Sequence, residues 1–299
     1  MSQPVPPAPA LLAPLVSAIV PCFNMGRYLA AALESVAAQS YPHWEVLVVD
    51  DAGPEDGSAE IVASFARIHP IHRVEFIRHE KNKGVGAARN TAIGAAHGQL
   101  MALLDPDDLW LPDHLASRVE VFAQNPEVAM ASSPAWLFSD DPALRLPMPE
   151  YFCDWERHLF PYALALRNGF PTSSVVLHRD RAPFPLAFDP TLHGTEDWDM
   201  WFRLVQAGAK FHLGEVPTAL YRKHPAAVTN HGDKLRIQLQ ALARKHGMAL
   251  FEYQWVASIH LSHLARTHEE QIRALIEKTN RPGLPTRIMR KLRGLLGRK

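Results

Sequence analysis

The 299-residue sequence has few cysteines, no excess of charge and no long hydrophobic run. Its two cysteines, Cys22 and Cys153, are too few for a disulfide framework and fit a reducing compartment. Lysine and arginine together number 31, as do aspartate and glutamate, so no net charge draws the chain to nucleic acid. No stretch reaches the apolar length needed to cross a bilayer. We therefore expect a cytoplasmic protein that does not bind nucleic acid.

Two short signals are also missing. Residues 1–14 are rich in proline and alanine but lack the basic region that begins a signal peptide, which predicts a flexible leader. No GxGxxG follows the first strand-like run, and this counts against a dinucleotide dehydrogenase. Hydrophobic residues nevertheless make up 47% of the chain, which is enough for a sizeable core.

The first half of the chain alternates strand-like and helix-like segments. The apolar, strand-like runs cover residues 15–20, 44–50, 73–78 and 99–104, and amphipathic stretches lie between them. Continuous apolar strands that alternate with helices predict an α/β fold, with a mainly parallel sheet flanked by helices. Ligands of such sheets bind at the carboxyl ends of the strands, so the polar residues there form the candidate site.

The stretch LLDPDDLW, residues 103–110, places Asp105, Asp107 and Asp108 directly after the fourth strand-like run. Asp105 and Asp107 are two residues apart, so in an extended strand exit their side chains point the same way. Two oxygen ligands on one side of an open loop suit a hard divalent ion, Mg²⁺ or Mn²⁺, that also holds a phosphate. The alternative is an Asp-Pro turn followed by a helix cap. The position after a buried strand favours the metal site.

Polar or aromatic residues follow the other strands as well. Asp51 directly follows the second run and is placed to accept hydrogen bonds from a nucleoside, although the GPEDG that comes after it is also typical of a turn. Phe23 and Asn24 follow the first run, where the ring either stacks on a base or belongs to the core. Arg89 and Asn90 begin a helix after a glycine-rich bend, a position that suits a diphosphate.

A second acidic pair, Glu196 and Asp197, lies in the motif GTEDWDMW at the start of a predicted helix. Acids in a first helical turn are common because the helix dipole favours them, and Thr195 is a candidate N-cap. The flanking Trp198 and Trp201 favour instead a pocket wall with an exposed carboxylate.

Six motifs, taken in order, resemble family 2 glycosyltransferases of the GT-A fold. They are SAIVPCFN, ESVAAQSYPHWEVLVVDDAGPEDGS, NKGVGAARNTAI, LLDPDDLWLPDHL, GTEDWDMWFRL and YRKH, and they span roughly residues 16–228. The resemblance implies transfer of a sugar, with inversion, from a nucleotide-diphosphate sugar to an acceptor hydroxyl. A UDP-sugar is the expected donor. One departure is the loop DDAGPEDGS, which is longer than the family's usual DDGSxDGS-like form.

The same resemblance implies a role for each matching residue. The nucleotide-binding residues would be Pro21, Phe23, Asn24, Asp51, Arg89 and Asn90. Asp105 would face the ribose and the metal, Asp107 would bind the metal directly, and His224 would contact the metal or the diphosphate. Asp197, the second acid of its pair, would be the catalytic base.

The C-terminal residues 286–299 are basic and carry an apolar helical stripe. This pattern indicates either an interfacial helix on an anionic membrane or a helix packed on the domain. Membrane contact would suit a glycan or lipid-linked acceptor in the assembly of bacterial surface polysaccharide or lipopolysaccharide. We expect a leader at 1–14, a glycosyltransferase domain at 15–230 and a helical segment at 231–299. The domain would comprise a nucleotide-binding half, 15–108, and an acceptor half, 109–230.

Two other functions are compatible with parts of this pattern. A sugar nucleotidyltransferase also uses an α/β sheet and Mg²⁺, but PCFNMGRY lacks that enzyme's glycine-rich activating loop. A non-catalytic nucleotide-sugar-binding protein would not need both Asp107 and Asp197.

Overall fold

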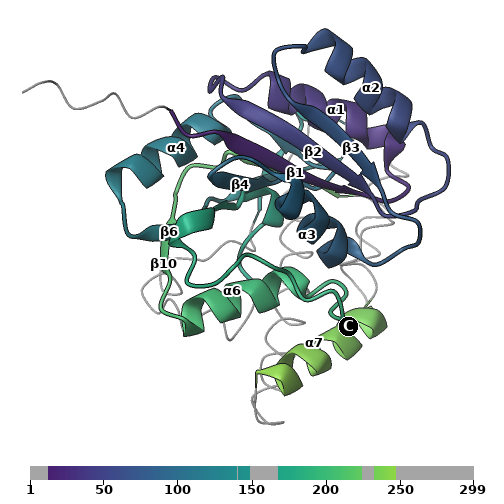
Figure 1. Cartoon of the computed structure of the whole chain (residues 1–299). Helices are drawn as coiled ribbons and strands as arrows, with labels where there is room; N and C mark the ends of the chain where they lie inside the picture. Colours follow the sequence, from purple (N-terminus) through teal and green to yellow (C-terminus); the bar gives the residue numbers. More distant parts are fainter. Residues whose placement is uncertain (1–12, 140, 149–167, 224–231, 247–299) are drawn as a thin grey trace, which may run out of the picture.

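The computed structural model describes residues 13–139, 141–148, 168–223 and 232–246, and a central sheet with helices on both faces dominates it (Figure 1). The strands are β1 (Val16–Cys22), β2 (Trp44–Asp50), β3 (Val74–Arg78), β4 (Leu100–Leu103), β5 (Leu109–Trp110), β6 (Val128–Ser132), β7 (Ala135–Phe138), β8 (Leu146–Pro147), β9 (Val176–His178), β10 (Lys210–Leu213) and β11 (Ala219–Arg222). The helices are α1 (Gly26–Ala37), α2 (Ser58–Ile68), α3 (Val85–Ala95), α4 (His114–Gln124), α6 (Glu196–Gln206) and α7 (Gly232–Lys245), with short 3₁₀ turns η2 (Thr172–Ser174) and η3 (Arg179–Arg181).

The main sheet has seven strands in the order β10-β6-β9-β4-β1-β2-β3. The pairs β1–β2, β1–β4, β2–β3 and β6–β10 are parallel, and β9 runs antiparallel between β4 and β6. The predicted mainly parallel sheet is thus confirmed, and each of the four strand-like runs forms a strand within two residues of its expected ends. The reversal at β9 brings in a strand from the second half of the chain.

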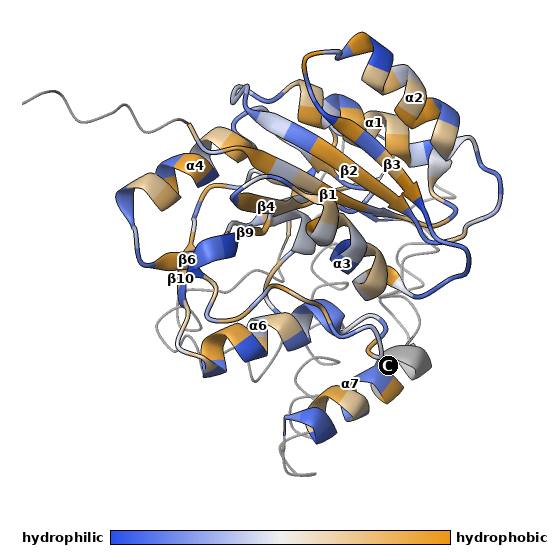
Figure 2. Cartoon of the chain, in the orientation of Figure 1, coloured by the Kyte–Doolittle hydropathy of each residue, from blue (hydrophilic) through white to orange (hydrophobic). Residues whose placement is uncertain are grey.

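Side chains alternate between the two faces of the sheet and build two cores. Residues such as Ile19 and Leu47 face α3, α6 and α7, whereas Val20 and Val48 face α1, α2 and α4. This period of two along each strand is what a sheet covered on both faces requires. Figure 2 shows the result as largely apolar central strands between helices in which hydrophobic and hydrophilic residues alternate.

A second, four-stranded sheet has the order β5-β11-β7-β8. Strands β5, β7 and β8 follow the acidic loop in the sequence, whereas β11 comes much later. Strand β11 pairs with β5 antiparallel and with β7 parallel. The last two described strands belong to different sheets: β10 extends the main sheet and β11 the smaller one. The small sheet was not expected from the sequence, since β5 and β8 contain two residues each.

Helix α7 packs on the same core as α6. Its Leu239 and Leu242 are buried beside Trp198 and Trp201 of α6. Gly208 ends α6 with a φ of 80° and a hydrogen bond from its N–H to the Val205 carbonyl, as expected for a glycine C-cap. None of the helices in the described part of the chain has both the length and the hydropathy to cross a membrane.

Candidate active site

Among the described residues, Phe23, Asn24, Asp51, Asp105 and Asp107 lie just after the carboxyl ends of β1, β2 and β4. These three strands are parallel neighbours, with Cys22 paired to Asp50 and Ile19 paired to Leu103. The loops that follow them therefore meet at one edge of the sheet. Cys22 itself is a buried core residue, and its burial raises the pKa of the thiol to about 11.

A pocket of about 390 Å³ opens directly after β1 and is lined by residues 23–27 together with Asp56. Phe23 lines it and is 47% exposed as a residue, so the interpretation of Phe23 as a core residue is wrong. Asn24 has a φ of 54°, which turns the chain away from the strand. Gly26 donates its N–H to Asp56 Oδ2 at 2.7 Å and approaches it too closely for a Cβ, so this wall of the pocket is fixed. Pro21, in contrast, is buried within β1.

The Asp51 carboxylate is buried and fully engaged by neighbouring groups. It accepts hydrogen bonds from the N–H groups of Lys83 and Gly84, the latter at 2.7 Å, and His79 Nδ1 lies 2.6 Å from its Oδ1. These contacts hold the start of α3 against the end of β2. The proposed contact of Asp51 with a nucleoside stays a prediction.

Asn90 of α3 contacts the backbone of Phe188 instead of the open edge of the sheet. Its amide nitrogen donates to the Phe188 carbonyl at 2.8 Å, and its amide oxygen accepts from the Phe188 N–H at 2.7 Å. This two-bond pair ties α3 to the loop that leads into α6. A role of Asn90 in nucleotide binding stays a prediction, and its observed contacts are structural.

Asp108 has a different environment from the other two aspartates after β4. Asp108 is buried and accepts hydrogen bonds from Ser173 Oγ at 2.6 Å and from the Arg222 N–H at 2.8 Å. Burial and the charges of Asp107 and Asp105 hold its pKa well above the usual range. Asp108 therefore joins the acidic loop to η2 and β11, while the other two are partly exposed.

Arg89 links the acidic loop to the second acidic pair. Its guanidinium is buried, and it donates to Asp105 Oδ1 at 2.8 Å and to Glu196 Oε1 at 2.7 Å. Burial alone would lower the pKa of this group, but the two carboxylates raise it above its ordinary value. Arg89 is therefore a permanent cation that neutralises two acids from opposite halves of the chain.

Asp197 is a half-buried carboxyl at the start of α6. Thr172 Oγ1 donates to its Oδ2 at 2.7 Å, Asn168 Nδ2 donates to the same oxygen at 3.0 Å, and the Trp198 N–H donates to Oδ1 at 2.6 Å. Burial and the neighbouring Glu196 raise the pKa of Asp197 to about 6, although Arg89 acts in the opposite direction. Such a group is ionised at neutral pH but holds a proton more readily than an ordinary aspartate.

The interpretation of GTEDWDMW as a helix cap is only partly confirmed. Thr195 is the N-cap residue of α6 by position, but its hydroxyl makes no cap hydrogen bond. Glu196 instead accepts the Gly194 N–H at 2.7 Å through the oxygen that Arg89 does not use. The two acids are thus held by specific partners.

Sequence reasoning missed the residues of η2 and the turn before it. Thr172 bonds Asp197, and Ser173 bonds both Asp108 and the Asp105 N–H, so this turn contacts both acidic motifs. The sequence feature that could have indicated them is PTSS, which precedes a strand-like segment. On its own, PTSS is typical of an ordinary polar turn.

The sequence predicts a divalent cation at Asp105 and Asp107, whose carboxylate oxygens are the ligand type that Mg²⁺ and Mn²⁺ prefer, and this site stays a prediction. Both carboxylates are partly exposed at the sheet edge, and Asp105 is bonded to Arg89 through Oδ1. Two carboxylates supply part of an octahedral oxygen shell, which phosphate oxygens commonly complete. Within the described ranges, no group of three or more His, Cys, Asp or Glu residues is arranged to hold a metal. His224, the other predicted metal contact, lies outside those ranges.

Residues 17–174, more than half of the chain, match the family model described as glycosyl transferase family 2. The chain belongs to glycosyl transferase family 2. Among family relatives, TuaG of Bacillus subtilis, whose name assigns it to teichuronic acid biosynthesis, is 39% identical over 107 residues. The Escherichia coli UDP-Glc:alpha-D-GlcNAc-diphosphoundecaprenol beta-1,3-glucosyltransferase WfgD is 35% identical over 111 residues. These matches cover 36% and 37% of this chain, and only 41% and 42% of TuaG and WfgD respectively.

The fold of this family 2 chain also matches solved structures. The mannosyltransferase PcManGT from Pyrobaculum calidifontis, in complex with GDP-Man and Mn²⁺, superposes with a TM-score of 0.63 at 20% identity. The match covers 98% of this chain and 84% of PcManGT. The predicted GT-A fold is therefore confirmed.

Proposed function

We propose that the protein is an inverting glycosyltransferase that moves a sugar from a nucleotide-diphosphate sugar to an acceptor hydroxyl. The observation that carries this proposal is the chain of contacts from Asp105 through Arg89 to Glu196, beside Asp197. These contacts connect the proposed metal ligand Asp105 to the helix start that carries Asp197, the proposed base, whose pKa is raised. Family membership supports the same reaction class.

The proposed reaction is a single displacement at the anomeric carbon. The acceptor oxygen attacks that carbon, the bond from carbon to phosphate oxygen breaks, and the nucleoside diphosphate leaves with the bonding electrons. Asp197 accepts the proton of the acceptor hydroxyl as the new bond forms. A positioned base of this kind contributes typically about 10²–10⁴-fold in rate. Thr172 and Asn168 orient its carboxylate through Oδ2.

Asp105 and Asp107 would hold Mg²⁺ or Mn²⁺. When bound, the cation stabilises the negative charge that develops on the departing phosphate. The Mn²⁺ in the PcManGT complex supports the use of a divalent ion here. Arg89 holds the Asp105 carboxylate in place, because its buried guanidinium donates a hydrogen bond to Oδ1 of that carboxylate.

The donor and acceptor classes rest on the relatives. WfgD uses a UDP-sugar and a diphosphoundecaprenol-linked acceptor according to its name, and TuaG is named for teichuronic acid biosynthesis. We propose a UDP-sugar donor and a glycan or lipid-linked acceptor in bacterial surface polysaccharide assembly. A peripheral position on the cytoplasmic face of the membrane, with contact through residues 286–299, would suit that acceptor. That segment lies outside the described residues.

Release of nucleoside diphosphate tests the proposed function. A panel of UDP- and GDP-sugars is incubated with the protein and Mn²⁺, and slow donor hydrolysis is followed by UDP or GDP formation. We expect UDP release from at least one UDP-sugar. A non-catalytic binding protein would be stabilised by the donor against heat without releasing UDP. A nucleotidyltransferase would release pyrophosphate from a nucleoside triphosphate.

Asp107→Asn is expected to weaken the response to Mn²⁺. The amide removes the negative charge that attracts the cation, so the Mn²⁺ concentration for half-maximal turnover should rise at least about 10–100-fold, the range known for perturbed metal sites. A Mn²⁺ titration of donor turnover measures this. Asp180→Asn is the matched control, since Asp180 is exposed and follows β9 at the opposite edge of the sheet. An unchanged titration in the Asp107 variant contradicts the metal role.

The rate is expected to fall in acid because Asp197 must be ionised to accept a proton. Its pKa is raised to about 6, so kcat/KM should be level above about pH 7 and fall about tenfold per pH unit well below pH 6. The measurement is a pH profile at saturating Mn²⁺. A profile that stays level down to pH 4.5 would exclude Asp197 as the base.

A further inference from the structure

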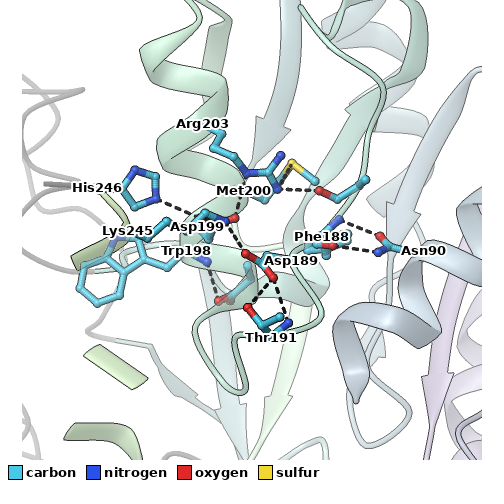
Figure 3. Close-up of polar contacts among 12 residues, drawn as sticks. Asn90, Phe188, Asp189, Thr191, Trp198, Asp199, Met200, Arg203, Lys245 and His246 are labelled. Carbon is cyan, nitrogen blue, oxygen red and sulfur yellow. Dashed lines mark hydrogen bonds and ion pairs between the residues drawn. The ribbon is translucent and has the colours of Figure 1, made fainter. Parts of the chain in front are cut away.

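The last turn of α7 is bonded to the segment that carries Asp197. Lys245 Nζ lies 2.6 Å from Asp189 Oδ2 and 2.8 Å from Asp199 Oδ1 (Figure 3). Asp189 belongs to the loop before α6, and Asp199 lies within the first turn of α6. One ammonium group therefore joins two points on either side of the proposed base.

Asp199 is the more deeply buried of the two aspartates, and its carboxylate contacts three basic side chains. Its side chain is 0% exposed, and besides Lys245 it accepts from Arg203 Nε at 2.8 Å and lies 2.9 Å from His246 Nε2. Burial tends to raise the pKa of Asp199, but these three partners keep it below its ordinary value. A fully buried carboxylate with three cationic or hydrogen-bonding partners has little freedom to move.

The loop before α6 is also held from the other side. Asn90 of α3 pairs with the Phe188 backbone, and the Asp189 side chain is bonded to Thr191 as well as to Lys245 (Figure 3). The contacts of α3 and α7 therefore converge on two consecutive residues of the loop.

We propose that Lys245 is a positioning residue, which fixes the orientation of Asp197 by bracing Asp189 against Asp199. The inference rests on the proposed function of Asp197 as the base. Lys245 does not reach the reacting groups; it acts through the first turn of α6. Misplacement of a catalytic group by about 1 Å can cost about 10²-fold in rate, so a brace of this kind has a measurable effect.

The apolar contacts of α7 do not depend on this lysine. Leu239, Leu242 and Ala243 are buried against the core that contains α6, and they hold the helix in place. Removal of the Lys245 ammonium should therefore loosen the loop without detaching the helix. Its neighbour Arg244 is exposed, and no ion pair involving it is among those of the described residues. Arg244→Met is thus a matched control for a lost positive charge on the same turn.

The test compares Lys245→Met, Lys245→Arg and Arg244→Met in the full-length protein. We expect Lys245→Met to lower kcat for UDP-sugar turnover about 10–100-fold, with the UDP dissociation constant and the donor KM unchanged. Lys245→Arg should recover most of the rate, and Arg244→Met should match the wild type. Hydrogen exchange at residues 189–199 should quicken only in Lys245→Met.

Three outcomes would overturn the positioning role. A wild-type kcat in the Lys245→Met protein would show that Lys245 is not needed to position Asp197. One in which kcat, UDP affinity and melting temperature fall together reports a general structural role. A wild-type protein that binds UDP but turns over no donor removes the proposed function itself, and the inference with it.

Discussion

Asp197→Asn is expected to lower turnover by about 10²–10⁴-fold, the usual contribution of a positioned general base. The amide keeps the shape of the side chain but cannot accept the acceptor's proton. Donor KM and UDP affinity should stay unchanged, because Asp197 bonds Thr172, Asn168 and the Trp198 backbone and not the acidic loop. Steady-state kinetics with the UDP-sugar identified in the donor panel measure the effect.

The same variant should be at least as stable as the wild type at pH 7.5. The pKa of Asp197 is raised in the folded protein to about 6, so its ionised form is less favourable there than in the unfolded chain. Above pH 6 that penalty is fully present, and a neutral amide removes it. A lower melting temperature together with lost activity would point to a structural defect instead. Asp180→Asn serves as the control for an aspartate outside the site.

Arg89→Met is expected to destabilise the protein by about 3–5 kcal/mol, because it leaves two acids without their buried partner. The Arg89 and Glu196 side chains are only 4% and 5% exposed, so solvent does little to screen the loss. Urea unfolding at pH 7.5 measures the free energy of unfolding. Arg67→Met, on the exposed face of α2, should change it by no more than about 0.5 kcal/mol.

A second variant separates lost packing from lost charge. Arg89→Met combined with Glu196→Gln removes one of the two uncompensated carboxylates, and it should recover part of the stability. If the double variant is no more stable than Arg89→Met alone, or if the single variant loses less than about 1 kcal/mol, Arg89 does not act as the electrostatic link described above.

The sequence predicts the central sheet well because its strands are long, apolar and buried on both sides. The run at 44–50 coincides with β2, and the acidic loop follows β4 as expected. The small sheet could not be predicted in the same way. Its two-residue strands carry no periodic pattern, and their pairing depends on contacts between β5 and β11 that are far apart in the sequence.

The roles of individual site residues were harder to predict than their positions. Asp107 and Asp108 are adjacent, yet burial and Ser173 make Asp108 a structural residue. Arg89 and Glu196 are 107 positions apart, so nothing local indicates that they pair. Contacts of this kind depend on how the chain folds back through β9, and a local pattern carries no information on that.

The Arg89 link also bears on how new specificities can be built by recombination. Arg89 and Asn90 come from the first 108 residues, whereas Glu196 and Phe188 come from the rest, so three hydrogen bonds of these two side chains cross any junction near the acidic loop. A chimaera that exchanges only the donor half must inherit a matching arginine and asparagine, or it leaves a buried glutamate without a counter-ion. Exchange of donor halves between family members is thereby restricted to parents that share the Arg89–Glu196 and Asn90–Phe188 contacts.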